Sequence, residues 1–285
     1  MNAYLIHLVN LGGIYIILAS SLNIIVGYAG LISLGHAAFF GIGAYASALL
    51  SLNFPALPFP LLIISGGATA GIIALVISPP ALKLKDEYLA VVTLGLGIII
   101  ELFFRNSDFT GGPDGMYGLS NFGLPPAGFI AYIWSILFLC ALLNWGLSRG
   151  QTGLNLTAVR KNELTARTMG ISPFPLKSAC FALSAAFAGC AGSLYAHYIT
   201  FISPGVFGLH TSILLLCMVV LGGMGTVFGP ILGAGALFLL PELLQAVADY
   251  QELVYGLLLI ITLIFRPQGL LGRVRKARHK DAQAA

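Results

Sequence analysis

A serine, a histidine and four closely spaced glycines (Gly30, Gly35, Gly41 and Gly43) lie in the apolar stretch GYAGLISLGHAAFFGIGAY. Glycines at this density let helices approach closely or interrupt a helix. If the helix breaks near Ser33–Gly35, His36 starts the next helix, and its free N–H groups can hold a carboxylate or another polar group. Unwound backbone within a membrane is tolerated where it lines such a cavity. Ser33, Gly35 and His36 are therefore candidate substrate-pathway residues, with purely structural hydrogen bonding as the alternative.

Two further polar residues, Thr93 and Glu101, lie in a later apolar segment. We add both to the candidate substrate pathway. For Glu101 the reason is that an ionisable side chain at a membrane span is a functional candidate. An ion pair with Arg105, four residues further on, is the structural alternative for Glu101. No two histidines are spaced as metal ligands, and the four cysteines fit no zinc or disulfide pattern, so no metal site is predicted.

The composition indicates what class of protein holds these residues. Charged residues make up 8% of the 285 residues and hydrophobic residues 58%, with a mean hydropathy of +0.94. A water-soluble fold carries about a quarter charged residues. The composition therefore predicts an integral membrane protein with most of its mass in lipid.

The apolar runs are continuous rather than alternating, which favours helices over a β-barrel. We predict an all-α polytopic membrane protein, a single transmembrane domain over residues 1–285 with about eight or nine transmembrane helices. Glycine-rich segments within it are expected to be broken or re-entrant, the second being LGGMGTVFGPILGAG at 221–235. The predicted spans lie near residues 4–27, 30–51, 58–79, 88–104, 128–148, 177–200, 209–222, 225–246 and 251–265.

Basic residues predict the orientation. They cluster at Lys83 and Lys85, from Arg149 to Lys177, and from Arg266 to Lys280, and all three clusters fit on the cytoplasmic side. Segment 149–176 is then cytoplasmic, as is a basic C-terminal tail at 267–285, which suits an anchor near anionic lipid. Segment 105–127 and the N-terminus fall outside.

The cytoplasmic segment contains one predicted short helix, from Asn155 to Met169. Asn155 or Thr157 can cap its start, Glu163 and Arg167 form an i,i+4 pair, and Gly170 is suited to end it. The helix is too short and too polar to span a membrane. It either lies on the lipid headgroups or is presented to another protein.

Several strings resemble one family, the branched-chain amino acid group of ABC-importer permeases. AVRKNELTARTMGI resembles that family's coupling loop, and GYAGLISLGHAAFFGIGAY its early glycine-rich segment. DEYLAVVTLG, TGGPDGMYGL, VVLGGMGTVFGPILGAG and FRPQGLLG resemble its middle, late and C-terminal motifs. TGGPDG together with RPQGL is closer to the LivM-type subunit than to its LivH-type partner.

The resemblance implies a permease subunit of an ATP-driven importer for branched-chain or related small amino acids in the bacterial cytoplasmic (inner) membrane. The implied partners are a LivH-type second permease subunit, two ABC ATPase subunits and a periplasmic solute-binding protein, with no nucleic acid. ATP and magnesium belong to the ATPase subunits, and this chain binds no cofactor of its own. By position, the ATPase-coupling residues are Arg160, Glu163, Ala166, Met169 and Gly170.

The outer loop TGGPDG combines turn-forming residues. One interpretation is a structural turn. The other is a contact with the solute-binding protein or the outer gate, through Thr110, Gly111, Gly112 and Asp114.

The chain lacks the phosphate-binding pattern G-x-x-x-x-G-K-[ST], and it also lacks G-x-S-x-G and H-E-x-x-H. We therefore expect no enzyme and no catalytic residue, and an ATP-driven transporter would require a separate ATPase chain. A secondary transporter or channel that needs no ATPase is the alternative. That class predicts ionisable residues deep in several spans, whereas only Glu101 comes close.

Overall fold

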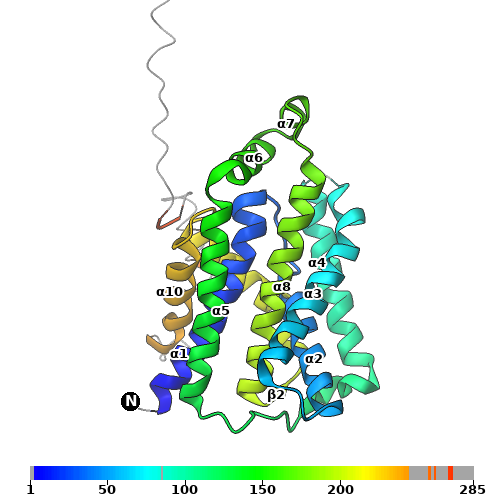
Figure 1. The fold of residues 1–285 in the computed structure, drawn as a ribbon, viewed down its shortest axis with the longest axis vertical. Helices are drawn as coiled ribbons and strands as arrows, with labels where there is room; N and C mark the ends of the chain where they lie inside the picture. Colours follow the sequence, from blue (N-terminus) through cyan, green and yellow to red (C-terminus); the bar gives the residue numbers. More distant parts are fainter. Residues whose placement is uncertain (1–2, 85, 244–255, 258–259, 261–268, 272–285) are drawn as a thin grey trace, which may run out of the picture.

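The computed structural model describes residues 3–84, 86–243, 256–257, 260 and 269–271. The helices stand side by side in one bundle, and α6 and α7 project beyond its upper end (Figure 1). This arrangement confirms the all-α fold class. The helices are α1 (Ala3–Asn23), α2 (His36–Asn53), α3 (Phe59–Leu82), α4 (Asp86–Asn106), α5 (Pro126–Leu147), α6 (Gly150–Lys161), α7 (Glu163–Thr168), α8 (Pro173–Ile199), α9 (Leu209–Gly222) and α10 (Gly229–Leu243).

Short elements connect these helices. A π-helical turn, Ile24–Ala29, continues α1, and 3₁₀ turns occupy Asp108–Thr110, Gly112–Asp114 and Pro204–Phe207. Strands β1 (Met116–Tyr117) and β2 (Phe201–Ile202) pair antiparallel at the lower end, with Met116 opposite Ile202.

Six segments within the described residues are long and apolar enough to span a membrane. They match the predicted spans at 4–27, 58–79, 88–104, 128–148, 177–200 and 209–222, the last extended at its start to Pro204. Helices α2 and α10 are not among the six, so the described residues do not confirm a count of eight or nine. The predicted span at 251–265 and the tail at 267–285 lie largely outside the described residues.

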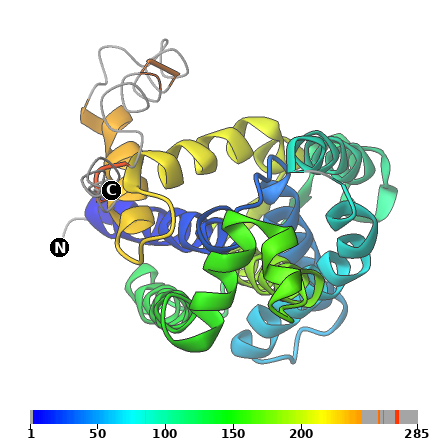
Figure 2. The ribbon, with the colours of Figure 1, turned by 90° about the horizontal axis from the view of Figure 1, so that it is seen from above.

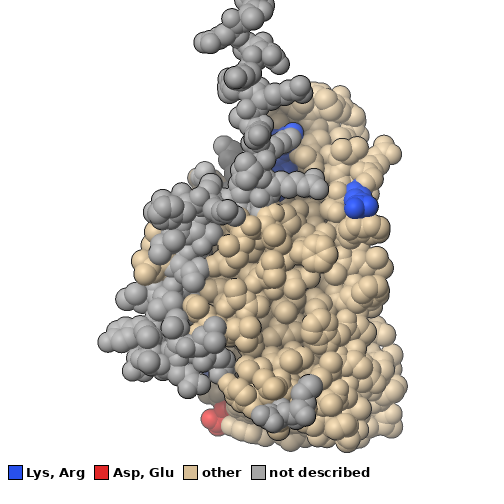
Figure 3. Space-filling view, turned by 90° about the vertical axis from the view of Figure 1, so that its left-hand side faces the viewer, with Lys and Arg blue, Asp and Glu red and all other residues tan. Residues whose placement is uncertain are grey.

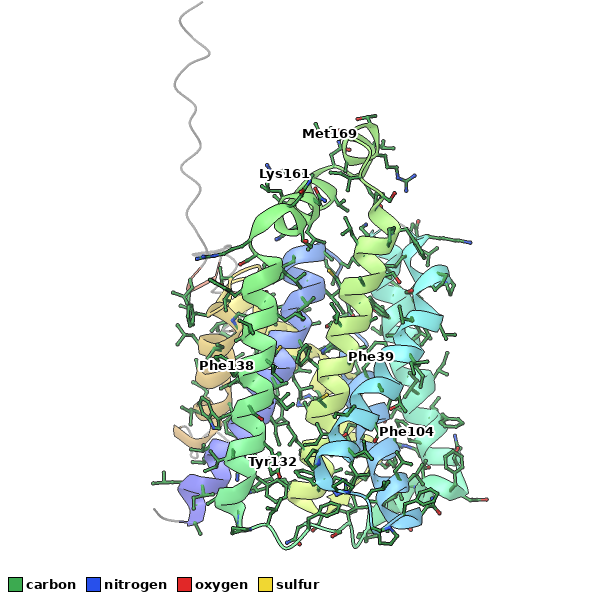
Figure 4. The ribbon with its side chains drawn as sticks, viewed as in Figure 1. Phe39, Phe104, Tyr132, Phe138, Lys161 and Met169 are labelled. Carbon is green, nitrogen blue, oxygen red and sulfur yellow. The ribbon has the colours of Figure 1, made fainter. Side chains whose placement is uncertain are left out.

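The break predicted in the first glycine-rich segment is present, so the apolar span at 30–51 is not one continuous helix. Gly30 adopts a left-handed conformation with φ 74° and ends the π-helical turn, and the next helix begins only at His36. Phe39, one turn into α2, lies near mid-height of the bundle (Figure 4). Residues 30–35 therefore lead as non-helical backbone from the upper end of α1 into the interior. The second glycine-rich segment is also broken as predicted, between Gly222 and Gly229.

Helix α8 packs against α1, α2, α3 and α5 and forms the centre of the bundle. Seen from above, α4 and α5 lie on opposite sides of it (Figure 2). The backbones of α2 and α8 approach so closely that a Cβ on Gly43 of α2 would lie 2.2 Å from the carbonyl oxygen of Gly189 on α8. Such approaches replace the hydrophobic effect, which is weak between helices in lipid.

Charge separates the two ends of the bundle. Helix α3 ends and α4 begins at the upper end, where α6 and α7 also lie (Figure 1). The described basic residues lie in or beside these upper elements. Arg105, at the lower end of α4, is the exception. The upper end is thus the end that the sequence assigns to the cytoplasm.

Candidate functional site

The first glycine break brings the start of α2 against two other helices. The Leu34 N–H donates to the Thr93 hydroxyl of α4 at 3.1 Å, and the Ala37 N–H donates to the Ser212 hydroxyl of α9, also at 3.1 Å. The predicted free N–H groups are therefore present but held by side chains. This arrangement satisfies the backbone at a depth where unpaired groups would be costly.

Unpaired polar atoms nevertheless remain beside this junction. The Nε2 atom of His36 lies 2.8 Å from the Ser21 hydroxyl. The His36 Nδ1 atom and the Ser33 hydroxyl have no hydrogen-bond partner among the described residues, although both side chains are almost completely buried. Buried polar atoms are paired in most native structures, so these two are available for a polar ligand when the surrounding helices separate.

Four of the five predicted pathway residues come together here. Ser33, Gly35 and His36 line the break, and a Cβ on Gly35 would lie 2.0 Å from the Thr93 carbonyl oxygen. Glu101 lies elsewhere. Its carboxylate accepts from Arg105 at 3.0 Å and lies beside Gly208, the N-cap of α9. The ion-pair alternative for Glu101 is thus present.

The prediction of one helix from Asn155 to Met169 is wrong. Helix α6 already begins at Gly150, so neither Asn155 nor Thr157 caps it, and Asn162 separates it from α7. The Asn162 side chain accepts the Thr165 N–H at 3.0 Å. This capping bond satisfies a free donor of a new helix start, which explains the break.

The end of α7 agrees with the predicted cap. Gly170 has φ 78°, the Ile171 N–H donates to the Ala166 carbonyl, and the Gly170 N–H donates to the Arg167 carbonyl. These two bonds form a Schellman motif, for which glycine is favoured. The predicted pair of Glu163 and Arg167 is present at 3.9 Å, and Lys177 lies 3.4 Å from the same carboxylate.

The five predicted coupling residues differ in their surroundings. Ala166 is buried, whereas Met169 is 71% exposed at the tip of the molecule (Figure 4). Leu164, which the sequence reasoning missed as a contact residue, is 74% exposed. Leu164 and Met169, here called the α7 knob, thus present two large apolar side chains beyond the helical bundle.

The Arg160 side chain contacts the helical bundle of this chain. Its guanidinium donates to the Gly27 carbonyl in the π-helical turn after α1. Its side chain also lies against Gly30 and Gly225, the glycines that follow α1 and α9. A cation at a helix C-terminus satisfies free carbonyls and complements the helix dipole. Arg160 therefore connects the projecting segment to both glycine breaks.

Asn23 forms a second connection that sequence reasoning missed. Its side-chain oxygen accepts the Gly225 N–H at 2.8 Å, and its amide donates to the Thr226 carbonyl at 3.0 Å and to Asn144 of α5 at 3.2 Å. An amide in an apolar span must be paired, so Asn23 could have been noticed from the sequence. Its partners could not, because they lie 121 to 203 residues away in the chain.

The C-terminal signature completes this junction. The Leu270 N–H donates to the Leu221 carbonyl at 2.8 Å, and the Leu271 N–H donates to the Gly222 carbonyl at 3.1 Å. These bonds satisfy the last carbonyls of α9, which otherwise have no partner within the helix.

The outer loop is built as a turn. The Thr110 hydroxyl is buried and lies 2.7 Å from the carbonyls of Phe104 and Ser107. Gly111 and Gly112 have positive φ angles, and the following residues pair with β2. Gly111 and Asp114 are exposed at the lower end, so they are the two of the four predicted residues best placed for contact.

Comparison with known proteins identifies the family. A family described as branched-chain amino acid transport system, permease component, matches residues 4–263. The chain is 37% identical to the high-affinity branched-chain amino acid transport system permease protein LivM of Escherichia coli K12, over 92% of this chain and 68% of LivM. The LivM protein of Salmonella typhimurium is 36% identical, over 95% of this chain and 71% of that protein.

The LivH permease of Salmonella typhimurium is more distant, at 25% identity over 93% of each chain. No solved structure matches the chain. The family match covers most of the spans and both glycine breaks. The chain is therefore a member of the family of permease components of branched-chain amino acid transport systems.

Proposed function

We propose that the chain is the LivM-type permease subunit of an ATP-driven importer for branched-chain or related small amino acids. It would work by alternating access in the bacterial inner membrane, with the upper end and the C-terminus in the cytoplasm. The proposed assembly adds a LivH-type permease, two ABC ATPase subunits carrying ATP and magnesium, and a periplasmic solute-binding protein that reaches the outer loop.

The α7 knob, together with Arg160, is the observation that carries this proposal. Exposed Leu164 and Met169 offer apolar surface outside the bundle, and an ATPase groove can cover it. A displacement of α7 would be transmitted to α6, because Asn162 alone separates the two helices. Arg160 then passes the displacement to the Gly27 carbonyl and to the second break. Conformational coupling needs such a continuous packed path.

The first break supplies the proposed substrate contacts. A zwitterionic amino acid needs polar groups at one end and an apolar surface at the other. Ser33 and His36 offer unpaired polar atoms at the start of α2, and Leu31 and Phe39 are apolar neighbours in the chain. Thr93 and Ser212 would release the α2 N–H groups to a carboxylate as α4 and α9 move.

The experiment replaces the α7 knob in the assembled transporter. We expect the L164Q/M169Q double variant to lose at least tenfold in binding-protein-stimulated amino acid uptake and in ATPase co-purification. L154Q is the matched control, because Leu154 is 72% exposed but belongs to α6. Thermal unfolding midpoints should be unchanged in both variants.

Two results would contradict the proposal. The first is normal uptake with the double variant. The second is solute accumulation by the purified chain without any nucleotide, which would favour a secondary transporter or channel.

A further inference from the structure

A groove of about 1380 Å³ opens between α5, α6, the end of α1 and the loop that follows α9. It lies at the upper end of the bundle, where α5 leaves its membrane span at Leu147. The residues that decide its character are Phe138, Leu142 and Trp145 from α5, and Arg149, Arg160 and Lys161 above them.

The groove is apolar below and cationic above. Figure 4 shows Phe138 about halfway up α5 and Lys161 above the bundle. On the corresponding face, the visible basic side chains lie near the upper edge, and the described surface below them is mostly uncharged, with an acidic group only at the lower edge (Figure 3). Among the residues that the structure describes, none that lines the groove is acidic. An anion is therefore the complementary ligand at its upper edge.

Trp145 and Arg149 mark the depth of the membrane surface. The Arg149 guanidinium lies 4.5 Å from the centre of the Trp145 ring, in the last turn of the span. Tryptophan is enriched at the headgroup level, and arginine reaches the phosphate level from a span end. The apolar wall then lies at acyl-chain depth, and the cations lie at phosphate depth.

We propose that this groove is a binding site for one anionic phospholipid. Its phosphate would lie between Arg149 and Lys161, and one acyl chain would follow Phe138 and Leu142 along α5. Basic pockets beside membrane spans bind acidic headgroups in this way. The proposal concerns the lone chain as well as the assembly and does not depend on the proposed transport function.

The two tryptophans of the chain provide the test. Trp134 and Trp145 both belong to α5 and are both 48% exposed, but only Trp145 lines the groove. The full chain is reconstituted in phosphatidylcholine bilayers as W134F, which keeps Trp145, or as W145F, which keeps Trp134. Fluorescence quenching is then measured with brominated phosphatidylglycerol and with brominated phosphatidylcholine.

We expect Trp145 to be quenched at about fivefold lower fractions of the anionic lipid than of the neutral lipid, and Trp134 to be quenched equally by both. General enrichment of anionic lipid would affect both tryptophans. K161Q in the W134F background should remove most of the preference, since each cation near the surface contributes about a fivefold effect. R167Q is the control, because Arg167 carries the same charge outside the groove.

Three outcomes would overturn the proposal. Equal quenching of Trp145 by both lipids would show no headgroup selection. Quenching of Trp134 but not of Trp145 would mean that protein fills the groove. Loss of the preference on adding inorganic phosphate at constant ionic strength would show a phosphate site that does not need a lipid.

Discussion

The two glycine breaks share a composition but differ in depth and partners. The first, at residues 30–35, ends inside the bundle, where Thr93 and Ser212 hold the start of α2. The second, at 223–228, lies at the upper end, where Asn23, Arg160 and residues 269–271 contact it.

This difference shows that glycine content permits a break, whereas the partners decide what the break can do. The first break is closed by neutral hydroxyls and leaves two buried polar atoms unpaired. It is suited to exchange its hydrogen bonds for those of a ligand. The second is closed by a cation of α6 and an amide at the end of α1. It is suited to transmit displacement.

Replacing Gly35 should give the largest effect, because the first break depends on close packing. In Gly35→Ala the new Cβ would lie 2.0 Å from the Thr93 carbonyl oxygen, and we expect a loss of about 3 kcal/mol or more in the free energy of unfolding. Gly95→Ala in α4 is the control, since nothing lies within 4 Å of its Cβ. The measurement is the thermal unfolding midpoint in detergent. An unchanged midpoint for Gly35→Ala would refute the close contact.

Replacing Asn23 should give an intermediate effect at the second break. Asn23→Ala leaves the Gly225 N–H and the Thr226 carbonyl unpaired, and we expect a loss of about 3 kcal/mol in unfolding free energy. Asn10→Ala removes one bond, to the Pro126 carbonyl, and should cost about 1 kcal/mol. Both asparagines are completely buried, so burial does not explain the difference. Equal losses in chemical denaturation would argue against the junction.

Replacing Arg160 should give the smallest change in stability and the clearest change in coupling. Arg160→Met removes the bond to the Gly27 carbonyl, and we expect a loss of about 1 kcal/mol in unfolding free energy. The number of ATP molecules hydrolysed per amino acid imported should rise several-fold, because α6 no longer holds the end of α1. Arg167→Met should leave this ratio unchanged, since Arg167 forms its ion pair within α7, with Glu163 at 3.9 Å. An unaltered ratio in Arg160→Met would count against transmission through this contact.

The sequence predicted those features that depend on local pattern. Continuous apolar runs placed the six long spans, Gly170 predicted the end of α7, and the glycines of both motifs predicted breaks. The ion pair of Glu101 and Arg105 followed from helical spacing alone. Each of these features is set within a few residues of chain.

Features that depend on distant partners could not be predicted. The break at Asn162 is a local exception, because the helical pattern continues on both sides of it and a single capping bond from the Thr165 N–H decides it. The Arg160 side chain reaches the Gly27 carbonyl only because α6 packs over the end of α1, and the sequence does not show this packing. The same holds for Asn23 and Gly225, which meet only after the whole bundle has formed.

The capping of α9 by residues 269–271 has a consequence for biogenesis. The last carbonyls of α9 receive their donors from a part of the chain that is synthesised almost fifty residues later. A nascent chain that stops before this point would enter the membrane with that helix end unpaired, and insertion machinery and proteases would meet it as an unfinished protein. Synthesis of residues 269–271 thereby becomes a condition for closing the junction at the upper end of the bundle.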